Sequence, residues 1–308
     1  MPYRHEICKA GRTIQHTYYY AQRADTKEGS RRKKENKTSE AQKKVNSRHA
    51  VKKLTWIFNE NFDGTSLYLT WSYDKKKRPD GKEALRADID RLLRYIRKIY
   101  RDEGRSAKYV WAAEVGERGA THIHMVLNAI DTAKLKKCWD KGWITIKPLD
   151  DSGQYRKLAN YFVKYSEKTM KTCEGFSGKR YNASRNLKIP QPTKTTIRSR
   201  NAYSHTIEIP RGYYVDKESI AEAWHEVSGY MYFTYTLIDG RKQGASKEAP
   251  PAAGDTYTLN LDTGEVQITE KPRKDRKNGT HEKKTILFCS KQRKNRRNRR
   301  TKRIRDKN

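Results

Sequence analysis

The sequence predicts an α+β fold: a ferredoxin-like βαββαβ core with an antiparallel sheet and one added helix. Short segments that alternate apolar and polar residues are typical of half-buried strands, and longer segments space their apolar residues as helices do. The third observation is their order along the chain: strand, helix, strand, strand, helix, strand, helix. We expect the last, added helix to lie over one face of the sheet.

The first strand is expected at 65–73 and the first helix at 81–100, where leucines and isoleucines recur at helical spacing with charges between them. A hairpin over 109–128 follows, with its tight turn at Gly116 and Gly119. The remaining elements are a short helix over 131–140 capped by Asp131, a strand over 143–147 and a helix over 153–169.

Two histidines, His122 and His124, lie one residue apart in the second strand of this hairpin. Alternate strand residues point to the same face, so the two imidazoles converge. If the hairpin closes symmetrically about its glycine turn, Glu114 is the direct partner of His122, with Cβ atoms about 4.5–5.5 Å apart. Two imidazoles and one carboxylate suit a divalent ion such as Mn²⁺ or Mg²⁺. The alternative is a structural pair of Glu and His across the strands, without metal.

The helix expected at 153–169 carries two tyrosines four residues apart, each followed by a lysine three positions on: Tyr161 with Lys164, and Tyr165 with Lys168. This spacing brings all four side chains to one side of the helix. A tyrosine hydroxyl is a poor nucleophile at its usual pKa, near 10, so it needs a polarised electrophile and nearby cations. The alternative is that the rings pack on the sheet while the lysines extend into water.

These motifs resemble, in their order, those of the His-hydrophobic-His (HUH) endonucleases, the Rep proteins that initiate rolling-circle replication of plasmids and single-stranded-DNA phages. Leu67-Tyr-Leu-Thr70 is similar to the family's first motif, His122-Ile-His124 to its metal motif and Tyr161-Phe-Val-Lys164 to its nucleophile motif. Glu114 stands where the family often places a third metal ligand. The resemblance covers residues 50–170.

The resemblance implies a divalent metal ion, Mn²⁺ or Mg²⁺, held by His122, His124 and Glu114, that acts as a Lewis acid on the scissile phosphate. Tyr161 would attack phosphorus and leave a 5′-phosphotyrosine and a free 3′-OH, while Lys164 would stabilise the developing charge. Tyr161 is favoured, but Tyr165 alone or the two tyrosines in succession remain alternatives.

The implied partners are single-stranded origin DNA and a host polymerase that extends the 3′-OH. A host helicase is also implied, because the chain has no Gly-x-x-x-x-Gly-Lys-Ser/Thr phosphate loop. We expect a DNA-associated protein of the bacterial cytoplasm, because no apolar run is long enough to cross a membrane.

The chain carries a formal charge of +33 on 308 residues, and hydrophobic residues make up only 34%. We expect four regions: a basic, weakly folded N-terminal segment (1–53), the endonuclease domain (54–170), a basic α/β extension (171–238), and a linker, hairpin and basic tail (239–308). The tail would bind phosphates without reading bases, unless it serves only solubility or binds ribosomes. The residues expected to contact DNA are Lys168, Arg293, Lys294, Arg296, Arg297, Arg299 and Arg300.

Within the extension, the sequence predicts a helix over 217–226 and a strand over 230–237, and beyond it a hairpin formed by 256–261 and 265–269. Two further hypotheses remain for the whole chain. One is a non-catalytic single-stranded nucleic-acid-binding module that stacks bases on Tyr and Trp. The other is a transposase or relaxase with the same tyrosine chemistry. A module that only stacks bases does not need two histidines facing a carboxylate. The set of Glu114, His122, His124 and Tyr161 therefore favours an enzyme over such a module.

Overall fold

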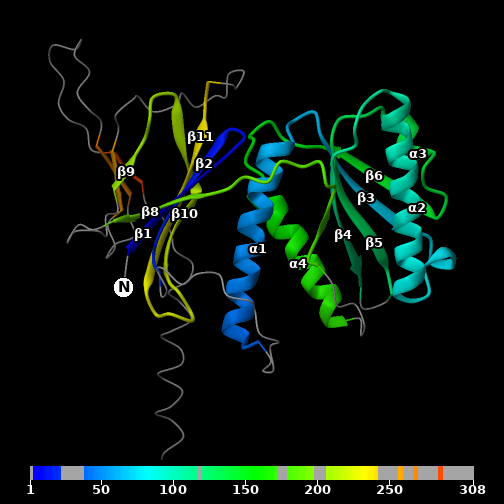
Figure 1. Ribbon diagram of the computed structural model, residues 1–308, viewed down its shortest axis with the longest axis horizontal. Coiled ribbons are helices and arrows are strands. Elements are labelled where there is room, and N and C mark those ends of the chain that lie inside the picture. Colours follow the sequence, from blue (N-terminus) through cyan, green and yellow to red (C-terminus); the bar gives the residue numbers. More distant parts are fainter. Residues whose placement is uncertain are drawn as a thin grey trace, which may run out of the picture.

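The computed structural model describes residues 3–21, 38–116, 119–172, 179–197 and 206–241, together with three short strands beyond them. Apart from a small third sheet, the described chain forms four layers (Figure 1): a second sheet, then helices α1 and α4, then a central sheet, then α2 with α3. The helices are α1 (Glu40–Asn61), α2 (Gly81–Asp102), α3 (Thr132–Lys136) and α4 (Arg156–Thr172), besides a short 3-10 turn at Lys75–Lys77.

The central sheet confirms the predicted core. Its strand order is β6-β3-β5-β4-β7, and all its pairings are antiparallel. Without the short edge strand β7, this order is that of a βαββαβ ferredoxin-like sheet. Its strands are β3 (Leu67–Tyr73), β4 (Tyr109–Val115), β5 (Thr121–Leu127), β6 (Gly142–Pro148) and β7 (Asn182–Ala183). The short helix α3 ends earlier than expected, but Asp131 caps it as predicted, accepting a hydrogen bond from the Ala133 amide.

The two faces of the central sheet are covered by different helices. Side chains of β3 such as Leu69 and Trp71 form a core with α2, which contributes Leu92 and Ile96 at the spacing that predicted it. On the opposite face, α1 and α4 pack against β4 and β5 in a second core that includes Phe162. This second face also carries the two histidines, because they alternate with the apolar residues of β5.

The expectation of a weakly folded segment over 1–53 is wrong for the residues described. Strands β1 (Tyr3–Ala10) and β2 (Thr13–Tyr20) form a hairpin, and α1 begins at Glu40 behind the N-cap Ser39. The first half of α1 is strongly charged, which obscures its pattern, whereas its second half buries Leu54 and Phe58. Basic composition alone therefore did not indicate the absence of a core.

The second sheet has the strand order β10-β11-β2-β1-β8 and so joins strands from both halves of the described chain. The helix predicted over 217–226 is wrong, because this segment belongs to strand β10, with a bulge between Asp216 and Ala221. Pairing with β11 outweighs the local helical preference of Ala221-Glu-Ala223. The strands not yet defined are β8 (Thr193–Ile197), β10 (Tyr213–Trp224) and β11 (Met231–Asp239).

Within the described parts of 171–238, α4 ends at Thr172 and strands follow, so the expected α/β extension is a β structure there. The hairpin predicted near 256–269 is confirmed: β12 and β13 pair antiparallel in a third sheet of order β14-β13-β12-β9. Its strands are β9 (Thr206–Glu208), β12 (Thr256–Leu259), β13 (Val266–Thr269) and β14 (Lys284–Ile286). The basic tail residues 293–300 lie outside the described residues.

Candidate active site

The candidate site lies on the face of the central sheet that α4 covers. The β4–β5 hairpin closes with the register expected from the sequence, pairing Glu114 with His122 and Val115 with Thr121. The turn starts with a hydrogen bond from the Gly116 amide to the Ala120 carbonyl, and Gly119 adopts the left-handed φ of 70° that favours glycine. Local closure of this hairpin therefore aligns the carboxylate with the two histidines.

His124 is buried, and both of its ring nitrogens have partners. Its Nε2 lies 3.0 Å from Oε2 of Glu114, so the carboxylate reaches diagonally past its direct register partner. Its Nδ1 lies 2.8 Å from the hydroxyl of Tyr68 on β3. Burial lowers the pKa of His124, although its hydrogen bond to Glu114 opposes this shift. The imidazole is therefore neutral at pH 7, which is the form that binds metals.

His122 lies on the same face but is only half-buried. Its Nδ1 is 3.0 Å from Oγ of Ser72 on β3, which leaves Nε2 for another partner. The ring centroids of His122 and His124 are 6.3 Å apart. Hydroxyl groups of β3 thus hold Nδ1 of each histidine, in the manner of groups that orient metal-ligating histidines from behind.

The donor set fits a divalent metal, but the structure does not fully assemble it. Two ligand atoms that each lie about 2.1 Å from one ion, at a right angle, are about 3 Å apart. Glu114 Oε2 and His124 Nε2 are 3.0 Å apart and so have this spacing. Across the described ranges, no three His, Cys, Asp or Glu side chains are close enough to hold an ion as they stand. His122 would have to turn its Nε2 toward the pair.

The two tyrosines of α4 lie against His124, as expected for a helix placed over this sheet face. The ring centroids of Tyr161 and Tyr165 are 4.0 Å apart, and they lie 5.4 Å and 5.2 Å from that of His124. Tyr161 also meets the ring of Tyr68 edge-on at 6.2 Å. The structure therefore brings both candidate nucleophiles to the Glu114 and His124 pair.

Hydrogen bonding makes the two hydroxyls unequal. Burial raises the pKa of Tyr161, as does its hydrogen bond to Tyr68, whereas the hydrogen bond from Tyr165 opposes this shift. The same hydrogen bond, together with burial, raises the pKa of Tyr165 to about 12, although the nearby Lys164 ammonium opposes the shift. Donation from Tyr165 to Tyr161 thus favours the phenolate of Tyr161 over that of Tyr165.

The lysines and tail residues are placed less completely. Lys164 is exposed on α4 beside the tyrosines, whereas Lys168 lies in α4 with a side chain that is not described. The remaining candidates for DNA contact, Arg293 to Arg300, lie outside the described residues.

Sequence reasoning missed three members of this site. Tyr68 and Ser72 were not assigned a role, although they hold the histidine rings. Trp143 on β6 was also missed: its side chain is 58% exposed, and its register partner is Ser72, which in turn pairs with His122. One row of register partners across four strands contains Trp143, Ser72, His122 and Glu114. The exposed indole of Trp143 therefore lies on the same sheet face as the histidines. Only the alternation within β6 could have indicated it.

The comparison with known families bears on this same unit. Residues 66–170 match the family model of the replication-associated protein ORF2/G2P. The matched span begins just before β3 and ends within α4, so it contains the histidines, Glu114 and both tyrosines. Searches of curated proteins and of solved structures gave no match. This part of the chain is thus similar to a replication-associated protein, and the second sheet and α1 lie outside the match.

No helix among the described residues is long and apolar enough to span a bilayer.

Proposed function

We propose that this chain is a rolling-circle replication initiator that nicks single-stranded origin DNA by tyrosine attack. The single observation that carries the proposal is the contact of Tyr161 and Tyr165 with His124, which is itself hydrogen-bonded to Glu114. The similarity of residues 66–170 to a replication-associated family supports the same conclusion.

In the proposed reaction the hydroxyl oxygen of Tyr161 forms a bond to phosphorus, and the bond from phosphorus to the 3′-oxygen breaks. The phenolic proton passes to water, and the 3′-oxygen takes up a proton, leaving a 5′-phosphotyrosine and a free 3′-OH. Glu114, His122 and His124 would hold Mn²⁺ or Mg²⁺, which supplies Lewis-acid polarisation of a non-bridging phosphate oxygen. Lys164 is close enough to Tyr165 to lower its pKa, and its ammonium would stabilise the negative charge on the phosphate.

Partners follow from this chemistry. The free 3′-OH would prime a host polymerase, and strand separation would be supplied by a host helicase. Trp143 offers a face on which an unpaired base can stack beside the histidines, which suits single-stranded rather than duplex DNA at the site.

A non-catalytic single-strand-binding module is the second candidate, and one observation favours it. Both nitrogens of His124 are already hydrogen-bonded, as in a structural cross-strand pair. A transposase or relaxase would use the same tyrosine chemistry on a different DNA substrate.

Incubation with labelled single-stranded DNA from the replicon and Mn²⁺ separates the candidates. A nickase gives a covalent protein–DNA adduct together with a fragment that a polymerase extends from its 3′-OH, and both products disappear with a chelator. Binding without adduct or extendable fragment, across candidate origins and divalent metals, would overturn the nickase.

A further inference from the structure

A large groove separates the second sheet from α1 and α4, outside the span that matches the replication-associated family for most of its length. Its volume is about 1680 Å³, well above the roughly 300–1,000 Å³ of clefts that hold single small molecules. At one end the β1–β2 turn is anchored on α1: the Gly11 amide donates to Oε2 of Glu60 at 2.7 Å, and Asn59 donates to Oγ1 of Thr13 at 2.9 Å. The groove extends from this anchor along α1.

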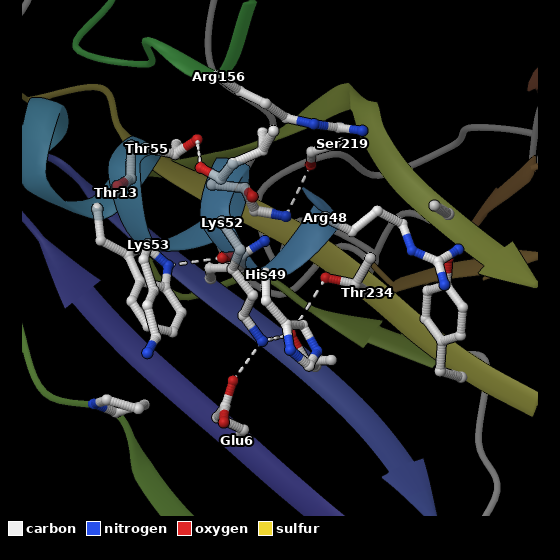
Figure 2. A pocket seen from close by; sticks show the side chains of 18 of the residues that line it. Glu6, Thr13, Arg48, His49, Lys52, Lys53, Thr55, Arg156, Ser219 and Thr234 are labelled. Atoms are coloured by element: carbon white, nitrogen blue, oxygen red, sulfur yellow. Dashed lines mark hydrogen bonds and ion pairs between the residues drawn. The ribbon is translucent and has the colours of Figure 1, made fainter. Parts of the chain in front are cut away.

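The groove is lined by positive charge. Seven of its lining side chains are Lys or Arg, against four Asp or Glu. Figure 2 shows Lys52 of α1 reaching across to Glu6 of β1, with Arg48, His49 and Lys53 from the same helix around it. Lys53 of α1 and Arg156 of α4 are exposed, as is Lys194 on β8, and all three line the groove. Lys194 lies 3.7 Å from Oε2 of Glu6, and Arg156 donates to the Glu218 carbonyl at 2.9 Å. Both side chains nevertheless remain exposed, so all three cations are accessible to a phosphate backbone.

Aromatic rings are interleaved with these cations. Six lining residues are Tyr or Trp. Tyr19 and Tyr232 are register partners on adjacent strands, and the Arg48 guanidinium lies 5.7 Å from the centroid of the Tyr232 ring. Tyr230, 38% exposed, lies 5.4 Å from Tyr20 between ring centroids. Partly exposed rings beside cations are the pattern by which proteins bind unpaired bases and the backbone that joins them.

The groove also leads to the candidate active site. Arg156, Lys157 and Asn160 line it from the first turns of α4, and Tyr161 is the next residue on that helix. Tyr161 itself faces His124 on the central sheet, about 100° around the helix axis from Asn160. A strand held at Tyr161 would therefore enter the groove by passing around this turn of α4.

We propose that this groove binds the single-stranded DNA that flanks the cleaved phosphate. Phosphates would lie on Lys53, Arg156 and Lys194, and unpaired bases against Tyr19 of β2, Tyr232 of β11 and Tyr230, which directly precedes β11. The proposal rests on the proposed function for the identity of the strand. The second sheet would then bind the strand, whereas the residues that carry the proposed chemistry all lie within the matched span, 66–170.

The test compares two triple variants of equal charge change in the full chain. The first removes the groove cations: Lys53→Ala, Arg156→Ala and Lys194→Ala. The matched control removes three exposed cations of α2 on the far side of the central sheet: Arg94→Ala, Lys98→Ala and Arg101→Ala. Equilibrium binding of a long single-stranded oligonucleotide is measured against salt. Each lost phosphate contact lowers the slope of log K against log salt by about 0.7.

The groove variant is expected to lower that slope by about 2. The α2 control should retain the wild-type slope. Any of three results would overturn the proposal. The slope could be unchanged in the groove variant, it could fall equally in the α2 control, or it could fall equally when duplex DNA replaces the single strand. Equilibrium binding requires no cleavage, so a wild-type protein that forms no adduct would overturn the proposed function and leave this test standing.

A second variant tests the bases themselves. Tyr230→Ala should weaken binding of the long oligonucleotide by roughly 5- to 100-fold, as loss of one stacked base does. The effect should vanish when the oligonucleotide carries abasic sites in its flank. Equal weakening with the abasic oligonucleotide would show that Tyr230 does not stack on a base.

Discussion

The hydroxyl of Tyr68 lies 2.8 Å from Nδ1 of His124, and the Tyr68 ring lies parallel to the imidazole, with an interplanar angle of 2° and ring centroids 6.1 Å apart. Tyr68 also meets Tyr161 edge-on. One residue of the first strand motif therefore connects a candidate metal ligand with a candidate nucleophile, and fixes which nitrogen of His124 faces Glu114.

Tyr68→Phe should retain the fold but loosen His124. Loss of a partner that orients a ligating histidine typically costs roughly 10- to 100-fold in metal affinity or activity. We expect the Mn²⁺ concentration for half-maximal adduct formation to rise by about that factor. Thr70→Val is the control, because Thr70 Oγ1 lies 3.4 Å from the same nitrogen and contributes less. Equal effects of the two variants would contradict a positioning role for Tyr68.

Trp143→Ala should raise KM for single-stranded substrate by roughly 5- to 100-fold with little change in kcat, because a stacked base is worth about 1–3 kcal/mol. Tyr95→Ala provides the control, since Tyr95 is 52% exposed on α2, away from both the histidines and the groove. Steady-state nicking kinetics with both variants measure the effect. A change in KM of the same size in the control would mean that exposed aromatic rings act nonspecifically.

Gly11→Ala should destabilise the docking of the second sheet. Gly11 has a φ of 55°, and an added Cβ would lie 1.9 Å from the backbone oxygen of Asn59. The left-handed conformation alone costs about 1–2 kcal/mol, and the clash adds to it. Gly104→Ala, with a φ of 67° but no atom within 4 Å of the added Cβ, isolates the conformational cost. Urea unfolding should show a larger loss for Gly11→Ala. Equal losses in the two variants would contradict a close approach of the β1–β2 turn to α1.

Stability should fall on acidification because of His16 in the second sheet. Burial, together with the neighbouring His5, lowers the pKa of His16 to about 4. The unfolded chain binds a proton near pH 6.5 and the folded protein does not, so the free energy of unfolding decreases between pH 6.5 and 4, by roughly 3 kcal/mol in total. In His16→Gln the decrease between pH 7 and 4 should be smaller by about that amount. An identical pH dependence in urea unfolding would contradict a neutral, half-buried His16.

The parts of the structure that follow from local pattern were predictable from the sequence. Apolar spacing located α2, and the turn at Gly116 and Gly119 set the register of Glu114 with His122, because a hairpin closes over few residues. The roles of Tyr68 and Ser72 depend on the pairing of β3 with β5, which lies about fifty residues further along the chain, and no local pattern specifies that pairing.

The sequence predictions failed at β10 and at α1 for the same physical reason. The segment Ala221-Glu-Ala223 favours a helix locally, but its pairing with β11 places it in a strand. Charge obscured α1, whose stability comes from the apolar face of its second half. In both cases tertiary contacts outweighed the preference of the segment alone.

The most direct test of the central claim is mass mapping of the protein–DNA adduct formed with single-stranded replicon DNA and Mn²⁺. The account predicts a phosphotyrosine on Tyr161 that disappears in Tyr161→Phe and in His122→Ala. An adduct on Tyr165 would keep the reaction and move the nucleophile by one helical turn. An adduct that persists in Tyr161→Phe/Tyr165→Phe, or no adduct with any origin and metal, would contradict the account.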